Sequence, residues 1–171
     1  MKLMILMLMS IWSAFTCYAN VDIRGTANLS QRLYTDTQPE HHENQSLIFI
    51  EPEFYVQINT NWTMLAKPYA RYDSLEAGRH QLDFKELNVS YIKGNFDAKV
   101  GVSEVFWGVT ESQHLVDIVN QTDVLSSIDG EDKLGQPMVQ LNWLHNSGAI
   151  QMFVMPYFRE RNFASKVQRL H

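Results

Sequence analysis

The chain has 171 residues, a formal net charge of −5 and a hydrophobic content of 45%. Mild acidity without a basic block argues against a nucleic-acid partner. No nucleophile elbow, zinc-protease motif, phosphate-binding loop or dinucleotide fingerprint is present, so we predict no enzyme and no cofactor. The acidic run Asp129–Asp132 lacks the spacing of an EF-hand, and we expect no metal site.

The first segment has the pattern of a signal peptide. Lys2 precedes an apolar stretch from Leu3 to Phe15, and the segment closes on Cys17-Tyr18-Ala19. This pattern predicts export and cleavage after Ala19. The apolar stretch is shorter than the roughly 20 residues of a membrane-spanning helix. We therefore expect a signal peptide at 1–19 and a single exported domain at 20–171 without any disulfide, because Cys17 is the only cysteine.

Segments with period-two alternation follow the signal peptide. In the first of them the odd positions from Val21 to Leu29 are small or apolar, and the even positions from Asp22 to Ser30 are polar. Such alternation predicts β-strands with one dry and one wet face. Pro52 cannot donate to a strand ladder, so we expect a bulge there. The predicted strands are Val21–Tyr34, Leu47–Ile58, Trp62–Tyr72, Phe84–Lys93, Phe96–Val102, Pro137–Leu144 and Ala149–Met155.

The connections between these strands alternate in length. The short ones are Asn59–Asn61, Gly94–Asn95 and His145–Gly148, and the long ones are Thr35–Gln45, Asp73–Asp83 and Ser103–Gln136, with a helical turn or two predicted near Ser112–Val119. Short turns at one end and long loops at the other are typical of outer-membrane barrels. Aromatic residues near strand ends fit an interfacial girdle: Tyr34, Trp62, Tyr72, Tyr91, Trp143 and Tyr157. These features predict an all-β, antiparallel, up-and-down transmembrane β-barrel.

The stretch from Lys99 to Leu141 carries an ordered set of small motifs. They are Val100-Gly101, Trp107-Gly108, Asp117-Ile118-Val119-Asn120 and Pro137, followed later by VMPYFRERNF at Val154–Phe163. In order and spacing this stretch resembles a family of porin-like β-barrels of Gram-negative outer membranes. Gln121 departs from the pattern, because the family usually has proline there. The resemblance implies structural roles for Gly101, Trp107, Gly108, Asp117, Asn120 and Pro137, and it implies outer-membrane lipid, the barrel-assembly machinery and small solutes as partners.

The long connection at 103–136 is rich in acidic residues. A charged loop folded into a lumen would attract cations and repel anions, and a solvated surface loop is the alternative. The candidate constriction residues are Glu104, Glu111, Asp117, Asp123, Asp129, Glu131 and Asp132. On the predicted strands, Glu51 and Glu53 face the same side as Lys67 and Arg71, and we expect cross-strand ion pairs in a lumen rather than acid–base catalysis.

Seven strands do not close a bacterial barrel, which takes an even number from eight upward. The chain also ends on His171 without a terminal aromatic strand. We therefore expect the N-terminal portion of a larger porin-like channel, one that passes small solutes and is non-functional alone if it is truncated. The alternatives are a soluble periplasmic or secreted β-sandwich that binds a partner, and an eight-stranded membrane anchor or adhesin. Oligomeric state and solute identity are left open by the sequence.

Overall fold

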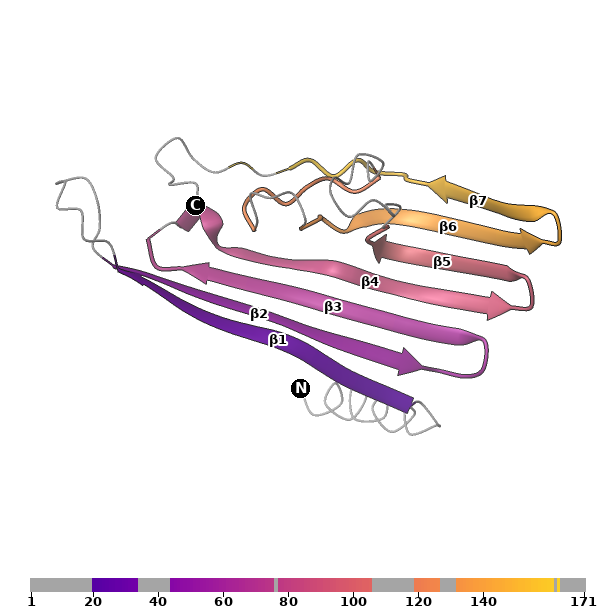
Figure 1. Ribbon diagram of the computed structural model, residues 1–171, viewed down its shortest axis with the longest axis horizontal. Helices are drawn as coiled ribbons and strands as arrows, with labels where there is room; N and C mark the ends of the chain where they lie inside the picture. The colour runs from indigo at the N-terminus through magenta and orange to yellow at the C-terminus, as the bar shows by residue number, and fades with distance from the viewer. Residues whose placement is uncertain are drawn as a thin grey trace, which may run out of the picture.

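The computed structural model describes residues 20–33, 44–75, 77–105, 119–126, 132–161 and 163. In these ranges the chain forms one seven-stranded antiparallel sheet in which each strand pairs with the next in sequence (Figure 1). The predicted all-β, antiparallel, up-and-down order of strands is confirmed. The elements are β1 (Asn20–Leu33), β2 (Asn44–Gln57), β3 (Trp62–Asp73), the short 3-10 turn η1 (Ala77–Arg79), β4 (Gln81–Lys93), β5 (Phe96–Ser103), β6 (Gln136–His145) and β7 (Gly148–Val154).

Most strand boundaries lie within one residue of those predicted, and two strands begin earlier than predicted. β2 begins at Asn44 and β4 begins at Gln81, three residues earlier than the alternation of apolar residues indicates in each case. Apart from Leu82, the residues in these two extensions are polar, which is why the hydrophobic pattern misses them. The predicted signal peptide at 1–19 and the predicted helical turn near 112–119, except for Val119, lie outside the described residues.

The sheet carries its irregularity on β3 and β4 rather than at Pro52. The register is continuous past Pro52, since Ile50 pairs with Ala70 and Phe54 with Ala66. The predicted bulge at Pro52 is therefore wrong. The register shifts instead between Lys67 and Pro68, where Lys85 is the extra residue of β4. Pro68 lacks an N–H to donate, and a bulge is a position at which a sheet tolerates this loss.

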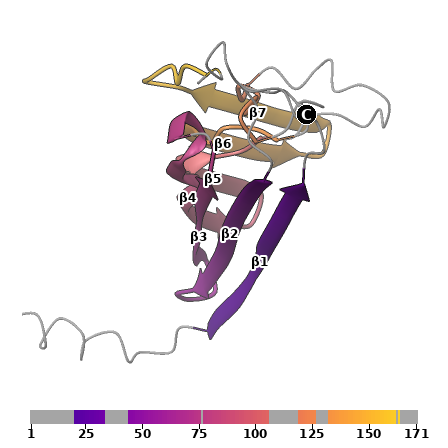
Figure 2. The same cartoon turned by 90° about the vertical axis from the view of Figure 1, so that its left-hand side faces the viewer.

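The two faces of the sheet have opposite chemistry. One face, called here the apolar face, presents small, aliphatic and aromatic side chains on every strand, many of them well exposed, such as Ile23 at 64% and Leu82 at 84%. Register rows such as Ile23–Phe54–Ala66–Leu87 carry this character straight across neighbouring strands. Figure 2 shows that the sheet is strongly twisted, with β1 steep and β7 nearly horizontal.

The opposite face, called here the polar face, holds most of the buried residues. Met138 and Tyr69 are 3% and 2% exposed, and they lie among polar and charged side chains that are equally buried. The buried polar and charged residues are Gln45, Arg71, Asp73, Asn88, Ser90, Ser103, Asn120, Asp123 and Gln136. Among the described residues, no helix is long and apolar enough to cross a membrane.

Candidate functional site

The polar face is partly covered by two pieces of the connection between β5 and β6. We call residues 119–126 and 132–135 the strap. Its two pieces run antiparallel, with a bridge between Thr122 and Lys133. The Asp123 amide donates to the Asp132 carbonyl at 2.8 Å, and the Leu134 amide donates to the Gln121 carbonyl at 2.8 Å. The strap therefore has its own backbone pairing and does not depend only on side chains for its shape.

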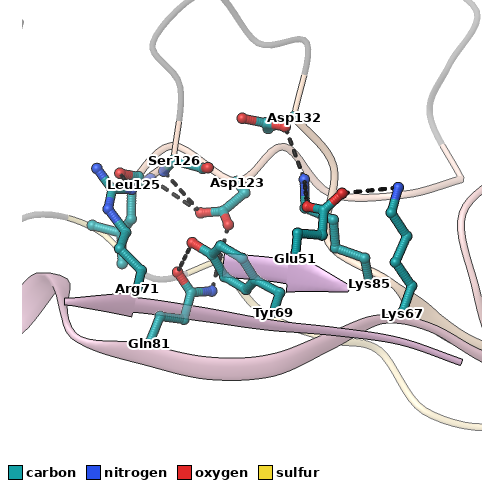
Figure 3. Close-up of polar contacts among 10 residues, drawn as sticks. All are labelled: Glu51, Lys67, Tyr69, Arg71, Gln81, Lys85, Asp123, Leu125, Ser126 and Asp132. Carbon is teal, nitrogen blue, oxygen red and sulfur yellow. Dashed lines mark hydrogen bonds and ion pairs between the residues drawn. The ribbon is translucent and has the colours of Figure 1, made fainter. Parts of the chain in front are cut away.

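A tight turn at Asp123 forms one end of the strap. One carboxylate oxygen of Asp123 accepts the backbone N–H groups of Leu125 at 3.1 Å and Ser126 at 3.3 Å. Aspartate favours such turns because its short side chain reaches the backbone two residues on. The other carboxylate oxygen accepts from the Gln81 amide of β4 at 3.4 Å, so the turn is tied to the sheet (Figure 3).

Two arginines, one on β3 and one on η1, bind the same turn from the side of the sheet. Arg71 on β3 donates to the Leu125 carbonyl oxygen, and Arg79 on η1 donates to it at 3.3 Å. Leu125 itself is only 5% exposed. Hydrogen bonds from a charged donor contribute more than neutral ones, on the order of 1.5–3 kcal/mol. These two arginines therefore bind the same backbone oxygen atom of the strap.

An ion-pair chain fixes the other end of the strap. Lys67 on β3 lies 3.0 Å from one Glu51 oxygen, and Lys85 on β4 lies 2.9 Å from the other. Lys85 also contacts Asp132 of the strap at 3.1 Å, as Figure 3 shows. The Lys85 and Glu51 side chains are 13% and 12% exposed, so these pairs are poorly screened by solvent. The bulge at Lys85 aims this side chain into the polar face next to Glu86.

Asn120 closes the base of the strap. Its side chain is 3% exposed and fully engaged with backbone groups. It accepts from the Val105 amide at 2.8 Å, and it donates to the Ser103 carbonyl at 2.8 Å and the Leu134 carbonyl at 2.9 Å. One amide side chain thus joins the end of β5 to both pieces of the strap, in addition to the backbone pairing of the strap itself.

The segment after β7 clamps the strap from its other side. Arg159 forms an ion pair with Asp83 of β4 and donates to the Gly135 carbonyl at 2.9 Å. Arg161 donates through two nitrogens to the Gln121 side-chain oxygen at 2.9 and 2.8 Å. The strap is therefore held between the sheet and the post-β7 segment, and its position does not rest on a single contact.

Glu104, the first residue after β5, is a carboxyl group in a desolvated position. One of its oxygen atoms is buried and has no hydrogen-bond partner among the described residues. Burial raises the pKa of Glu104 to about 7; Lys85 and Lys67 oppose this rise, and Glu86 and Glu51 add to it. Glu104 therefore changes charge near neutral pH inside a group of charged residues.

The structure brings together only some of the predicted site residues. Glu104, Asp123 and Asp132 lie on or beside the strap. The Asp123 and Asp132 carboxylates contact Gln81 and Lys85 of β4 on the polar face. Glu51 pairs with Lys67 as expected, whereas Arg71 binds the strap carbonyl instead of a glutamate. Glu53 lies opposite Arg24 of β1 in the register. Glu111, Asp117, Asp129, Glu131, Trp107 and Gly108 lie outside the described residues.

Gly101, one of the small-motif residues, occupies a constrained position. Gly101 has a φ of +139°, and a Cβ atom there would lie 2.2 Å from the Leu87 carbonyl oxygen. Only glycine allows β4 and β5 to approach this closely. Pro137 pairs with Val102 on the apolar face. The sequence reasoning missed Lys85, Gln81, Arg79 and Arg159, because their roles depend on a bulge and on long-range contacts that alternation does not reveal.

No protein-family model, curated protein or solved structure matches this chain. The porin-like resemblance at Lys99–Phe163 therefore stays a prediction. In the described ranges no group of three or more histidine, cysteine, aspartate or glutamate side chains could hold a metal ion.

Proposed function

We propose that this chain is a wall segment of an outer-membrane β-barrel through which small solutes pass, with the strap narrowing the lumen. The observation that carries the proposal is the distribution of polarity across the sheet. The uncovered face is apolar on all seven strands, and the covered face is polar and charged. Water-soluble proteins have the reverse arrangement, with apolar side chains covered and polar ones exposed.

The apolar face has the height of a bilayer core. On β3 it extends from Trp62 to Tyr72 without a charged side chain. At about 3.3 Å per residue this is about 33 Å along the strand, or about 25 Å across the membrane at a tilt near 40°. Outer-membrane barrels have an apolar band about 25 Å tall. Beyond Tyr72 the same face turns polar, where Ser46 donates to the Gln31 side chain at 2.7 Å.

Aromatic side chains mark the other border of the band. Trp62 pairs with Tyr91 across β3 and β4, with ring centroids 4.8 Å apart. Phe96 pairs with Trp143 across β5 and β6. These pairs lie at the ends of the strands that carry the short turns. Tryptophan and tyrosine favour the membrane–water interface because each combines an apolar ring with a polar atom.

A soluble β-sandwich would have to cover the apolar face with a second sheet. In the described ranges nothing covers it, and Leu29 is 76% exposed while Ile150 is 62% exposed. Contiguous apolar patches of more than a few hundred Å² mark interfaces with proteins or membranes. Apart from Lys93 at the end of β4, this face carries no charged side chain on the seven strands. Such a face fits acyl chains, which accept any apolar surface regardless of its detailed shape.

Vesicle binding of the purified chain tests the membrane part of the proposal. The protein is refolded with lipid vesicles, washed with sodium carbonate at high pH and floated on a density gradient. The wild type and a variant with a new polar-face charge, Thr26→Asp, are expected to float with the vesicles. A matched apolar-face variant, Ala27→Asp, is expected to float less. Recovery of all three as soluble monomers with cooperative unfolding would support the sandwich instead.

Solute passage is a separate claim and needs a closed wall. It is measured on a version whose sheet has been closed by added strands, as swelling rates of vesicles in sugars of increasing size. Weakening the strap with Lys85→Met is expected to raise the size limit, because Lys85 joins Asp132 to the wall. An unchanged size limit would show that the strap does not narrow the path.

A further inference from the structure

The sheet has two free edges, one on β1 and one on β7. Neither edge pairs with another strand in the part of the chain that the structure describes. A strand edge carries unpaired N–H and C=O groups, which cannot stay unpaired in lipid. We propose that these two edges dock an odd number of further antiparallel strands, at least three, and not a second copy of this sheet. This inference rests on the proposed membrane function.

The odd number of added strands follows from the directions of β1 and β7. Strand directions alternate in the meander, so β1 and β7 of a seven-stranded sheet run in the same direction. An odd number of added strands lets both edges pair antiparallel, and it gives the even total that bacterial outer-membrane barrels have. A second copy inserted with the same orientation would place β7 against the partner's β1 in parallel. Copies of this sheet in one membrane orientation therefore cannot complete an antiparallel wall.

The minimum of three follows from the strap. A barrel of eight strands, spaced about 4.8 Å apart and tilted about 40°, has a diameter of about 16 Å and an interior that side chains fill. The strap adds a second layer of backbone on the polar face, and its own Leu125 and Leu134 side chains are buried. A strap in the lumen packs against the barrel wall on both sides, and each packing distance is about 10 Å. The barrel diameter must then be about 20 Å, which corresponds to about ten strands. One added strand would therefore leave no room for the strap.

The edges also define the chemistry of the strands that fit them. On β1 the apolar face presents Ile23 and Leu29 and the polar face presents Asp22 and Arg24. Both sets are exposed, so each side chain has room for a cross-strand neighbour. The added strands must alternate in the same way, with apolar residues toward lipid and polar residues toward the strap.

Strands copied from this chain can serve as the probe. β2 runs opposite to β7, so residues 44–57, 44–73 and 44–93 supply one, two or three strands when they are appended to the full chain. A fourth version carries one added strand but replaces residues 104–135 with Asn-Gly, which suits a tight hairpin between the paired residues Ser103 and Gln136. Each version is refolded in detergent micelles and run on a gel with and without heating.

We expect a heat-modifiable band, the mark of a closed barrel, for the version with three added strands. The strapless version with one added strand is expected to show it as well. The unmodified chain and the versions that keep the strap with one or two added strands are expected to lack it. Closure with two strands overturns the parity, and closure with one strand and the strap intact overturns the minimum. Closure of the unmodified chain, or of no version, overturns both.

The floating assay keeps this test separate from the membrane proposal. If no version binds vesicles, the proposed function is wrong and the edges need another explanation. If all versions bind vesicles but close at a different strand number, only the inference about the edges is wrong.

Discussion

Arginine substitutions at different depths of the apolar face give the sharpest prediction. Ala66 lies four residues from Trp62 on β3, and Val89 lies two residues from Tyr91 on β4, in rows that the register aligns. At about 3.3 Å per residue and a tilt near 40°, these positions lie about 10 Å and about 5 Å inside the aromatic border. Ala66 is therefore close to the middle of the band, and Val89 is shallower.

The depth sets the expected loss of stability. An arginine on the lipid face costs about 2–4 kcal/mol at the midplane and about 0–1 kcal/mol near the interface. Interpolation gives about 2.5 kcal/mol for Ala66→Arg and about 1.5 kcal/mol for Val89→Arg. Gln57 lies on the polar face and is exposed, so Gln57→Arg is the matched control with an expected change within about 0.5 kcal/mol.

Urea unfolding in lipid vesicles measures these differences on the version with three added strands, with each substitution placed in the original strand and tryptophan fluorescence as the signal. The order Ala66→Arg, Val89→Arg, Gln57→Arg in decreasing loss supports a lipid-facing band. If all three variants lie within about 0.5 kcal/mol of the wild type, the face contacts water and the reasoning is refuted. An equal loss at Gln57 would instead show that arginine disturbs the sheet at any position.

Four further predictions concern the strap and the sheet. Asn120→Ala removes three hydrogen bonds to backbone groups and should cost about 3 kcal/mol, measured by unfolding, with faster proteolysis of the strap. Lys85→Met should cost more than Lys67→Met in the same assay, because Lys85 forms ion pairs with both Glu51 and Asp132, whereas among the described residues Lys67 forms one with Glu51. Since the pKa of Glu104 is raised from 4.5 to about 7, the folded state holds this proton more tightly than the unfolded state, so stability should fall as pH rises from about 4.5 to about 7. That fall is about 3 kcal/mol at 1.36 kcal/mol per pH unit, and Glu104→Gln should flatten the profile, whereas an unchanged profile would assign the fall to other groups. Gly101→Ala should prevent β4–β5 pairing, seen as lost protection of the Val102 amide in hydrogen exchange, because a Cβ atom would lie 2.2 Å from a backbone oxygen.

Alternation alone was enough to predict the sheet. The rows from Val21 to Leu29 and from Trp62 to Tyr72 each show one dry and one wet face, and all seven predicted strands lie within or beside observed ones. The short turns were also predicted from residue type, because asparagine side chains accept hydrogen bonds from nearby backbone groups. In the structure the Asn59 side chain accepts the N–H groups of Asn61 and Trp62. Both signals are local in sequence.

The site could be predicted only in part, because its contacts are long-range. Glu51 and Lys67 share a face by period, and their ion pair was expected. Simple counting along β4 places Lys85 on the apolar face, and only the bulge opposite Lys67 and Pro68 turns it toward Glu51. Arg71 was expected to meet a glutamate, but the Leu125 carbonyl of the strap lies closer, and no pattern in the sequence places that carbonyl.

The central claim is that the apolar face of the sheet contacts lipid acyl chains. Spin labels placed one at a time along β3, from Trp62 to Asp73, test it most directly, with Cys17 replaced by serine. The account predicts that even-numbered positions collide with oxygen dissolved in the bilayer, most strongly near Ala66, and that odd-numbered positions are shielded from it. Equal collision with a water-soluble nickel complex at even and odd positions would contradict the claim.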